Sequence, residues 1–243
     1  MTSYQVLDWD TKYFGFKVVK IIKNIKNIDE LITVLDSAKK EKVTLVYWAN
    51  TEYPGDDINL TIDKLGGLLV DEKITYKIDL TTTISETRNE LKDVIIEPYN
   101  PSIPMWLMHA LAIQSGEYSR FAVDPHIPRE KYEGLYKIWI ESSVNKQIAN
   151  EVLVILEKGA VAGMITLGEK SGRGDIGLLA VDKKYRGKKY GIALVYAAHQ
   201  WFVDHEYNSG QVVTQRKNLA ACHLYEKCGY TADTVEYFYH FWL

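Results

Sequence analysis

The sequence predicts a mixed α/β fold, and two patterns carry this prediction. Short apolar runs with strand character, such as residues 43–48, alternate with segments whose apolar residues recur at helical spacing, such as residues 28–40. In addition, an apolar strand that stops at Asp182 leads into a basic loop with Gly187 and then into a helix that opens near Gly191. Such a unit directs free backbone N–H groups and a positive helix end to one point, which suits a phosphate.

The first part of the chain predicts a small α/β domain over residues 1–80. Its expected elements, in chain order, are a strand over 16–22, a helix over 28–40, a strand over 43–48, a helix over 58–65 and extended chain over 68–80. Gly66 and Gly67 end the second helix. The polar stretch 81–93 is the predicted linker to a second domain over residues 94–243.

The second domain predicts the element order β–α–α–β–β–β–α–β–α–β. Pro101 and Pro104 precede its first helix, which runs through Trp106 and Ile113, and an irregular loop follows at 119–125. A helix is expected over 131–144, strands over 152–156, 160–167 and 176–181, a helix over 189–205, a strand over 211–215, a helix from Asn218 to Gly229 and a last strand over 230–243. Asn218 suits a helix N-cap and Gly229 a position just past the helix end.

Charge and composition narrow the classes of partner. The chain has 243 residues and a formal net charge of −3, so no general attraction to nucleic acid or acidic membranes is expected. The basic pair Lys188–Lys189 is therefore a local feature and suggests a small anionic ligand. No apolar stretch is long enough to span a membrane, and the first ten residues lack the pattern of a secretory signal, so we expect a cytoplasmic protein.

The cysteines and histidines predict neither a disulfide framework nor a metal site. Cys222 and Cys228 lie six residues apart, so on a helix they point in different directions and fit two reduced structural thiols. The six histidines show no metal-ligand spacing, and we expect His199 and His205 on the surface. The aromatic end of the chain fits either a buried last strand or an exposed edge that forms a homodimer, through Tyr237, Phe238, Tyr239, Phe241 and Trp242.

Two motifs in this order resemble the GNAT family of acyl-CoA N-acyltransferases over about residues 94–243. Arg186-Gly-Lys-Lys-Tyr-Gly191 is similar to the family's Gln/Arg-x-x-Gly-x-Gly/Ala signature, with Lys189 where the central glycine is usual. Asn218-Leu-Ala-Ala-Cys-His-Leu-Tyr-Glu-Lys-Cys-Gly-Tyr230 resembles the family's second conserved segment. A competing pattern, Gly172-Arg-Gly-Asp-Ile-Gly177, fits a dinucleotide fingerprint but precedes a predicted strand rather than a helix, so we reject it.

The resemblance implies a GNAT fold in the C-terminal part and acetyl-CoA as cosubstrate. Its implied acetyl-CoA contacts are Leu179, Ala180 and Val181 for the pantetheine arm, Arg186, Gly187, Lys188, Lys189, Tyr190, Gly191 and Ile192 for the pyrophosphate, and Asn218. Tyr225 is implied as the general acid that protonates the leaving thiolate. The general base stays open among Glu169, Asp175 and His109.

Further segments resemble the TDP-fucosamine acetyltransferase group within this family. They are Leu7-Asp-Trp-Asp-Thr-Lys-Tyr-Phe-Gly15, Ser119-Arg-Phe121 and Leu135-Tyr-Lys-Ile-Trp139. The resemblance implies a dTDP-linked 4-amino-4,6-dideoxyhexose as acceptor, with the N-terminal domain on the sugar-nucleotide side. Candidate acceptor contacts are Ser119, Arg120, Phe121, Tyr136 and Trp139, with Arg120 as a cation for the diphosphate. For Tyr136 and Trp139, packing of their helix against the core is an equal alternative. A GNAT acting on another small amine or a protein amine, and a non-catalytic acyl-CoA-binding module, remain alternatives.

Overall fold

The structure is a computed structural model that describes residues 3–52, 56–81 and 94–243. Its residues form two compact units. Unit 1 combines residues 1–73 with 119–126 and 235–243, and unit 2 combines residues 74–118 with 127–234. Nearly all of the predicted linker, 81–93, lies outside the described residues, so the linker and the proposed domain limits stay predictions.

Unit 1 is a sheet whose two faces are covered by helices. Its elements are β1 (Tyr4–Val6), α1 (Asp8–Phe14), β2 (Val18–Ile21), α2 (Ile28–Lys40), β3 (Leu45–Asn50), α3 (Asp56–Lys64), the first part of β4 (Gly67–Asp79), α5 (Arg120–Val123) and the second part of β10 (Thr231–Trp242). The strand order is β1-β2-β3-β10-β4. Strands β2 and β3 are parallel, whereas β1 with β2 and β3 with β10 are antiparallel.

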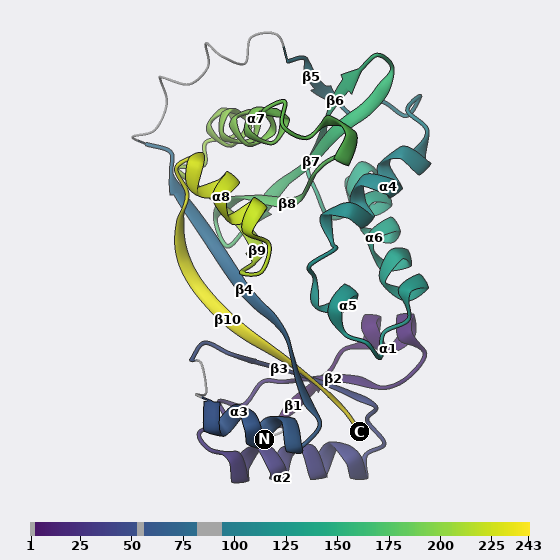
Figure 1. Ribbon diagram of the computed structural model, residues 1–243, viewed down its shortest axis with the longest axis vertical. Helices are drawn as coiled ribbons and strands as arrows, with labels where there is room; N and C mark the ends of the chain where they lie inside the picture. The colour runs from purple at the N-terminus through teal and green to yellow at the C-terminus, as the bar shows by residue number, and fades with distance from the viewer. Residues whose placement is uncertain (1–2, 53–55, 82–93) are drawn as a thin grey trace. The chain divides into compact units, whose positions relative to one another are not determined.

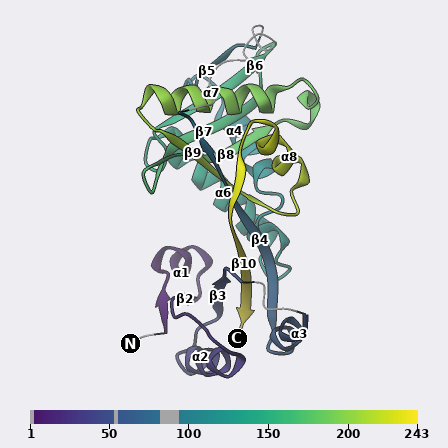
Figure 2. The same ribbon diagram turned by 90° about the vertical axis from the view of Figure 1, so that its left-hand side faces the viewer.

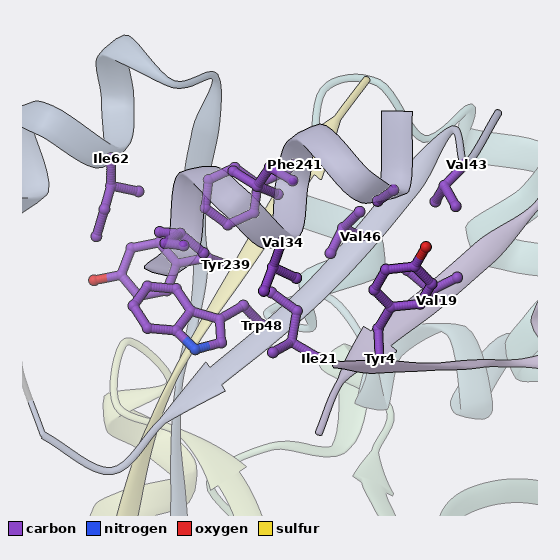
Figure 3. Close-up of a cluster of buried hydrophobic side chains, with 13 residues drawn as sticks. Tyr4, Val19, Ile21, Val34, Val43, Val46, Trp48, Ile62, Tyr239 and Phe241 are labelled. Atoms are coloured by element: carbon purple, nitrogen blue, oxygen red, sulfur yellow. The ribbon is translucent and has the colours of Figure 1, made fainter. Parts of the chain in front are cut away.

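The main core of unit 1 lies between α2, α3 and one face of this sheet. Alternate residues of β3 and β10 point into it, among them Trp48, Tyr239 and Phe241, and they meet the apolar stripe of α2 (Figure 3). Helix α2 begins at the N-cap Asn27, whose Oδ1 accepts a hydrogen bond from the Glu30 backbone N–H at 3.0 Å. Local capping and the apolar stripe together explain why this helix has the limits that the sequence predicts.

Unit 2 contains most of the second predicted domain. Its elements are the second part of β4, β5 (Ile96–Pro98), α4 (Met105–Ser115), α6 (Arg129–Val144), β6 (Glu151–Glu157), β7 (Ala160–Lys170), β8 (Arg173–Val181), the 3₁₀ turn η2 (Lys183–Tyr185), α7 (Tyr190–Asp204), β9 (Ser209–Gln215), α8 (Leu219–Lys227) and the start of β10. The strand order is β4-β9-β8-β7-β6-β5. Helix α7 covers one face of these strands and helices α4 and α6 cover the other (Figures 1 and 2).

The structure adds one helix, corrects one expected loop and decides between two alternatives for the last strand. Residues 8–14, for which no helix was predicted, form α1, and the expected loop at 119–125 contains the short helix α5. The last strand is buried rather than exposed at an edge, because β10 lies between β3 and β4, and Tyr239 and Phe241 are at most 1% exposed. Phe238, Tyr239 and Phe241 are therefore core residues of unit 1, and of the two alternatives for this strand the structure shows the buried one.

Candidate active site

Strands β8 and β9 separate halfway along their length. They pair in parallel only through residues 174–176 of β8 and 210–212 of β9, although β8 continues to Val181 and β9 to Gln215. Beyond the last pair, Ile176 with Val212, no strand among the described residues lies beside the backbone of β8 on this side. A gap between parallel strands leaves backbone donors and acceptors available to a ligand.

A local irregularity in β8 accompanies the separation. The register between β7 and β8 shifts between Ile165 and Leu167, and the Leu178 backbone N–H donates to Thr166 Oγ1 at 2.8 Å. A Cβ atom on Gly177 would lie 2.7 Å from the same hydroxyl, so glycine permits this close approach. The Thr166 hydroxyl thus accepts a backbone N–H of β8 at the irregularity between β7 and β8.

The backbone beyond the irregularity points into the gap at alternate residues. The Asp182 N–H donates to Ala162 O at 2.9 Å, so the antiparallel alternation turns the polar groups of Ala180 toward β7 and those of Leu179 and Val181 away from it. Val181 O accepts a hydrogen bond from Arg186 Nε at 3.2 Å. Of the three strand residues predicted for the pantetheine arm, the geometry therefore favours Leu179 and Val181.

The loop after β8 presents the start of α7 without a side-chain cap. Gly187 and Lys189 have φ values of +83° and +62°, and Lys189 is the N-cap residue of α7. The Lys189 side chain makes no capping hydrogen bond to this helix, so it does not occupy the N–H groups of the first turn. This arrangement of a helix N-terminus beside a positive-φ loop suits a phosphate group.

Two lysines of this region pair with glutamates. Lys188 Nζ lies 2.6 Å from Glu157 Oε1, and Tyr190 donates its phenolic hydrogen to the same carboxylate at 2.6 Å. The hydrogen bond from Lys188 holds the pKa of Glu157 below its ordinary value. Lys183 pairs with Glu117 at 2.8 Å. The roles predicted for Lys188, Tyr190, Gly191 and Ile192 in phosphate binding stay predictions.

Helix α8 carries the other two predicted acyl-CoA residues. Asn218 is its N-cap, and its Oδ1 accepts a hydrogen bond from the Ala221 N–H at 3.2 Å. Tyr225 is 5% exposed and lies between Tyr76 and Tyr230, with ring centroids 6.1 Å and 5.9 Å away. Burial raises the pKa of Tyr225 above its ordinary value, so the phenol keeps its proton at neutral pH.

His199 is buried, which corrects its predicted place on the surface. It is 7% exposed on α7 and packs against Tyr196 and Tyr230. Burial lowers its pKa to about 4, so the imidazole is neutral. The stripe of Ile192, Val195, Ala198 and Phe202 that predicted the inner face of α7 does not include His199, because the buried face of this helix is wider than that stripe.

The three candidate bases each have a partner within the protein. Glu169 Oε1 accepts from the Gly172 N–H at 2.6 Å, and His109 Nε2 lies 2.6 Å from Glu141 Oε1. Asp175 accepts from Gln211 Nε2 at 2.9 Å, and burial raises its pKa above the ordinary value. None of these contacts singles out one residue, so the general base remains unassigned.

The candidate acceptor residues belong to different units. Tyr136 and Trp139 lie on α6 of unit 2, where Tyr136 is buried against Gly116 and the ring of Trp139 lies 4.8 Å from its own. A Cβ at Gly116 would lie 2.2 Å from Tyr136 Cζ, so this tyrosine is a packing residue of unit 2. Its further role and that of Trp139 stay predictions.

In unit 1, Arg120 lies among aromatic rings. Its Cζ lies 4.6 Å from the ring centroids of Tyr47 and Phe121 and 5.0 Å from that of Phe238. Sequence reasoning missed the polar residues around it, which are Asp10, Tyr47, Asp124 and His240. The alternation of residues in β10 could have revealed one of them, because it places His240 on the same face as Phe238 and Trp242.

A groove elsewhere in unit 2 has a volume of about 600 Å³. Its lining includes Lys77, Asp79, Arg173 and Thr231. Lys77 and Arg173 each lie 2.7 Å from a carboxylate oxygen of Asp233, so the two cations share one carboxylate. This groove does not include the residues of the strand gap or of α8 named above.

The described part of the chain gives three further results. No helix in it is long and apolar enough to cross a bilayer. No group of three or more His, Cys, Asp or Glu side chains among the described residues is arranged to hold a metal ion. Cys222 and Cys228 are both buried free thiols, and burial raises the pKa of Cys228 to about 12.

Comparison with known proteins agrees with this geometry. Residues 115–230 match the acetyltransferase (GNAT) family. A Staphylococcus epidermidis protein of unknown function is similar in fold, with a TM-score of 0.69 and 14% identity over 92% of this chain and 84% of its own. A GCN5-related N-acetyltransferase from Sphaerobacter thermophilus has a TM-score of 0.61 and 13% identity, covering 98% of this chain and 75% of its own.

A curated relative is similar in sequence over part of the chain. The spore coat polysaccharide biosynthesis protein SpsD of Bacillus subtilis is 27% identical over 132 residues. The match covers 54% of this chain and 45% of SpsD, so it spans less than half of that protein.

Proposed function

We propose that the chain transfers an acetyl group from acetyl-CoA to an amino sugar. The match of residues 115–230 to the acetyltransferase (GNAT) family supports this proposal. The proposed acceptor is the 4-amino group of a dTDP-linked 4-amino-4,6-dideoxyhexose, and both substrates are bound together when transfer occurs. The separation of β8 from β9 beyond Ile176 is the observation that carries the acetyl-CoA part of this proposal.

In this proposal the strand gap and the start of α7 hold acetyl-CoA. The backbone of Leu179 and Val181 pairs with the amide groups of pantetheine, because these residues turn their polar groups away from β7. The loop from Arg186 to Lys189 and the uncapped first turn of α7 bind the pyrophosphate. Binding the thioester and the amine side by side then supplies much of the rate.

The transfer forms one bond and breaks another. The neutral amine attacks the thioester carbonyl, a C–N bond forms, the C–S bond breaks, and the amine loses one proton to a base that stays unassigned. Tyr225 donates a proton to the departing sulfur, a role supported by its neutral, buried phenol. A backbone N–H of Leu179 or Val181 in the gap can stabilise the oxyanion.

The sugar acceptor rests on different support. SpsD, whose name assigns it to spore coat polysaccharide biosynthesis, shares 27% identity over 132 residues with this chain. Polysaccharide biosynthesis uses activated sugars, so this likeness favours a nucleotide sugar over a protein amine. The segments at 7–15, 119–121 and 135–139 that resemble sugar-nucleotide acetyltransferases support the same choice.

Incubation of the protein with acetyl-CoA and dTDP-4-amino-4,6-dideoxygalactose tests the proposal. We expect one added acetyl group in the sugar nucleotide by mass spectrometry, together with release of free thiol. The gluco epimer, run in parallel, reports on the stereochemistry that the site accepts. A reaction without protein measures spontaneous transfer.

The same assay separates the alternatives. Thiol release with other small amines or peptides, but with neither sugar nucleotide, would identify a GNAT enzyme with a different acceptor. Calorimetric binding of acetyl-CoA without thiol release for any amine would identify a non-catalytic acyl-CoA-binding module.

A further inference from the structure

Glu157 is the last residue of strand β6 in unit 2, and a tight hairpin fixes its position. It pairs with Ala160 of β7, and the two residues between them, Lys158 and Gly159, have φ values of +52° and +81°. Two successive positive φ values are typical of the two-residue turns whose twist matches that of the flanking strands. The Glu157 carboxylate is therefore attached to a rigid part of the sheet.

The two oxygens of this carboxylate hold two residues at the start of α7. Lys188 Nζ donates to Glu157 Oε1, and the Tyr190 hydroxyl donates to Glu157 Oε2, each at 2.6 Å. Lys188 Nζ also lies 5.4 Å from the centroid of the Tyr185 ring. We name Glu157, Lys188 and Tyr190 the Glu157 clamp.

The clamp holds the residues on both sides of Lys189. The φ of Lys189 is +62°, a left-handed conformation that is less favourable for a residue with a side chain than for glycine. Residues keep such conformations when the surrounding structure restrains them. Because Lys188 and Tyr190 are both bound to one carboxylate, the backbone at Lys189 is restrained from either side. The N–H groups in the first turn of α7 follow directly after this backbone.

The clamp is intact at neutral pH. The hydrogen bond from Lys188 lowers the pKa of Glu157, and the bonds to this carboxylate raise the pKa of Lys188 and that of Tyr190. Glu157 is therefore ionised, Lys188 is charged and Tyr190 keeps its proton. Lys188 and Glu157 together carry no net charge, so this lysine attracts a diphosphate less than an unpaired cation would.

We infer that Glu157 is a positioning residue for acetyl-CoA, because its clamp holds Lys189 in the conformation that presents the first turn of α7 to the pyrophosphate. This inference rests on the proposed function, in which this loop binds the pyrophosphate. The side chains of Lys188 and Tyr190 hold the loop, and backbone N–H groups contact the phosphates. A loop that is ordered before binding loses less entropy on binding. The clamp also explains how the chain accepts lysine where the GNAT signature that this loop resembles usually has glycine.

Calorimetric titration with acetyl-CoA tests the inference without any acceptor. Glu157→Gln keeps the size of the side chain and removes its charge. We expect its Kd for acetyl-CoA to be about 3–5-fold higher than that of the wild type, as the loss of an exposed ion pair predicts. Glu117→Gln is the matched control, because Glu117 pairs with Lys183 at 2.8 Å shortly before the same loop and lies outside the clamp. It should bind acetyl-CoA as the wild type does.

A second background separates positioning from a direct effect on the ligand. Glycine adopts a positive φ without restraint, so in the presence of Lys189→Gly the change Glu157→Gln should raise the Kd less than about 2-fold. A direct electrostatic effect of Glu157 on acetyl-CoA would be of equal size with and without Lys189→Gly, because independent effects add.

Lys188→Met removes the clamp from its other side and keeps most of the side-chain stem. Alone, it should raise the Kd for acetyl-CoA by about 3–5-fold, and it should add little to Glu157→Gln, because the clamp is then already broken. Thermal unfolding checks that each variant is folded. If Glu157→Gln does not fold, Lys188→Met with and without Lys189→Gly makes the same test.

Three results would overturn the inference. They are acetyl-CoA binding by Glu157→Gln that is as tight as in the wild type or tighter, equal losses of affinity with and without Lys189→Gly, and a full additional loss when Lys188→Met is combined with Glu157→Gln. The last result would make Lys188 a direct phosphate ligand. In all three cases the wild type still binds acetyl-CoA, so the proposed function stands. If the wild type does not bind acetyl-CoA, the proposed function fails and the inference fails with it.

Discussion

Lys189 holds a backbone conformation that glycine adopts more easily. Its φ of +62° lies in the left-handed region, at the position where the GNAT signature that this loop resembles usually has glycine. A side chain there costs roughly 1–2 kcal/mol, and the greater freedom of glycine in the unfolded chain offsets roughly 0.5–1 kcal/mol of that. We expect Lys189→Gly to raise the free energy of unfolding by up to about 1 kcal/mol in urea denaturation.

Lys188→Gly is the comparison for this variant, because Lys188 has no positive φ and pairs with Glu157. It should lower the unfolding free energy instead. A loss of stability in Lys189→Gly would show that the lysine side chain contributes more than its conformation costs.

Tyr225 is the residue on which the proposed chemistry depends most directly. Tyr225→Phe should lower kcat by about 10²–10⁴-fold, because the departing thiolate loses its proton donor. The dissociation constant for acetyl-CoA, measured by calorimetry, should change little. Tyr230→Phe is the control, since it removes a neighbouring buried phenol whose hydroxyl has no hydrogen-bond partner among the described residues. Near wild-type turnover in Tyr225→Phe would remove this residue from the mechanism.

At the scale of elements, one hydroxyl of β7 holds the β8 backbone at Leu178, next to the point where β8 and β9 separate. Thr166→Val keeps the shape of the side chain but leaves the Leu178 N–H without its acceptor. We expect the unfolding free energy to fall by about 1–3 kcal/mol and acetyl-CoA to bind more weakly, because the backbone at Leu179 loses its fixed position. Urea denaturation and calorimetry measure the two effects.

Thr166→Ser retains the hydroxyl and is the matched variant. It should keep acetyl-CoA affinity close to that of the wild type. Equal acetyl-CoA affinity in Thr166→Val and wild type would show that β7 does not set the geometry of the gap.

At the scale of the whole molecule, buried His199 makes folding dependent on pH. Its pKa is lowered from 6.5 to about 4 in the folded chain, so the unfolded chain binds more protons between these values. The contribution to stability is complete above about pH 6.5 and is lost as the pH falls toward about 4, a total of about 3 kcal/mol. Urea denaturation at a series of pH values measures this loss.

The variant His199→Phe should show a smaller loss of stability over this range. His205→Gln is its control at an exposed position near the end of the same helix, and it should follow the wild type. If wild type and His199→Phe lose stability in parallel, His199 is not the group responsible.

The sequence by itself determined the order and type of most elements and the two motifs of the site. Helix α2 occupies the predicted residues 28–40, and Asn218 caps α8 as predicted, because apolar spacing and capping act within a few residues. The sequence also predicted the limits of the loop and helix around Gly187, because these limits depend on local backbone conformation.

Only the tertiary structure decided which segments meet. Strand pairing joins residues far apart in the chain, so α5 and the end of β10 lie in unit 1 with residues 3–52, and His240 faces Tyr47. Burial of His199 and the separation of β8 from β9 beyond Ile176 likewise depend on packing between distant segments. Local patterns fix the period of a strand, whereas its partners and the exposure of its side chains come from long-range contacts.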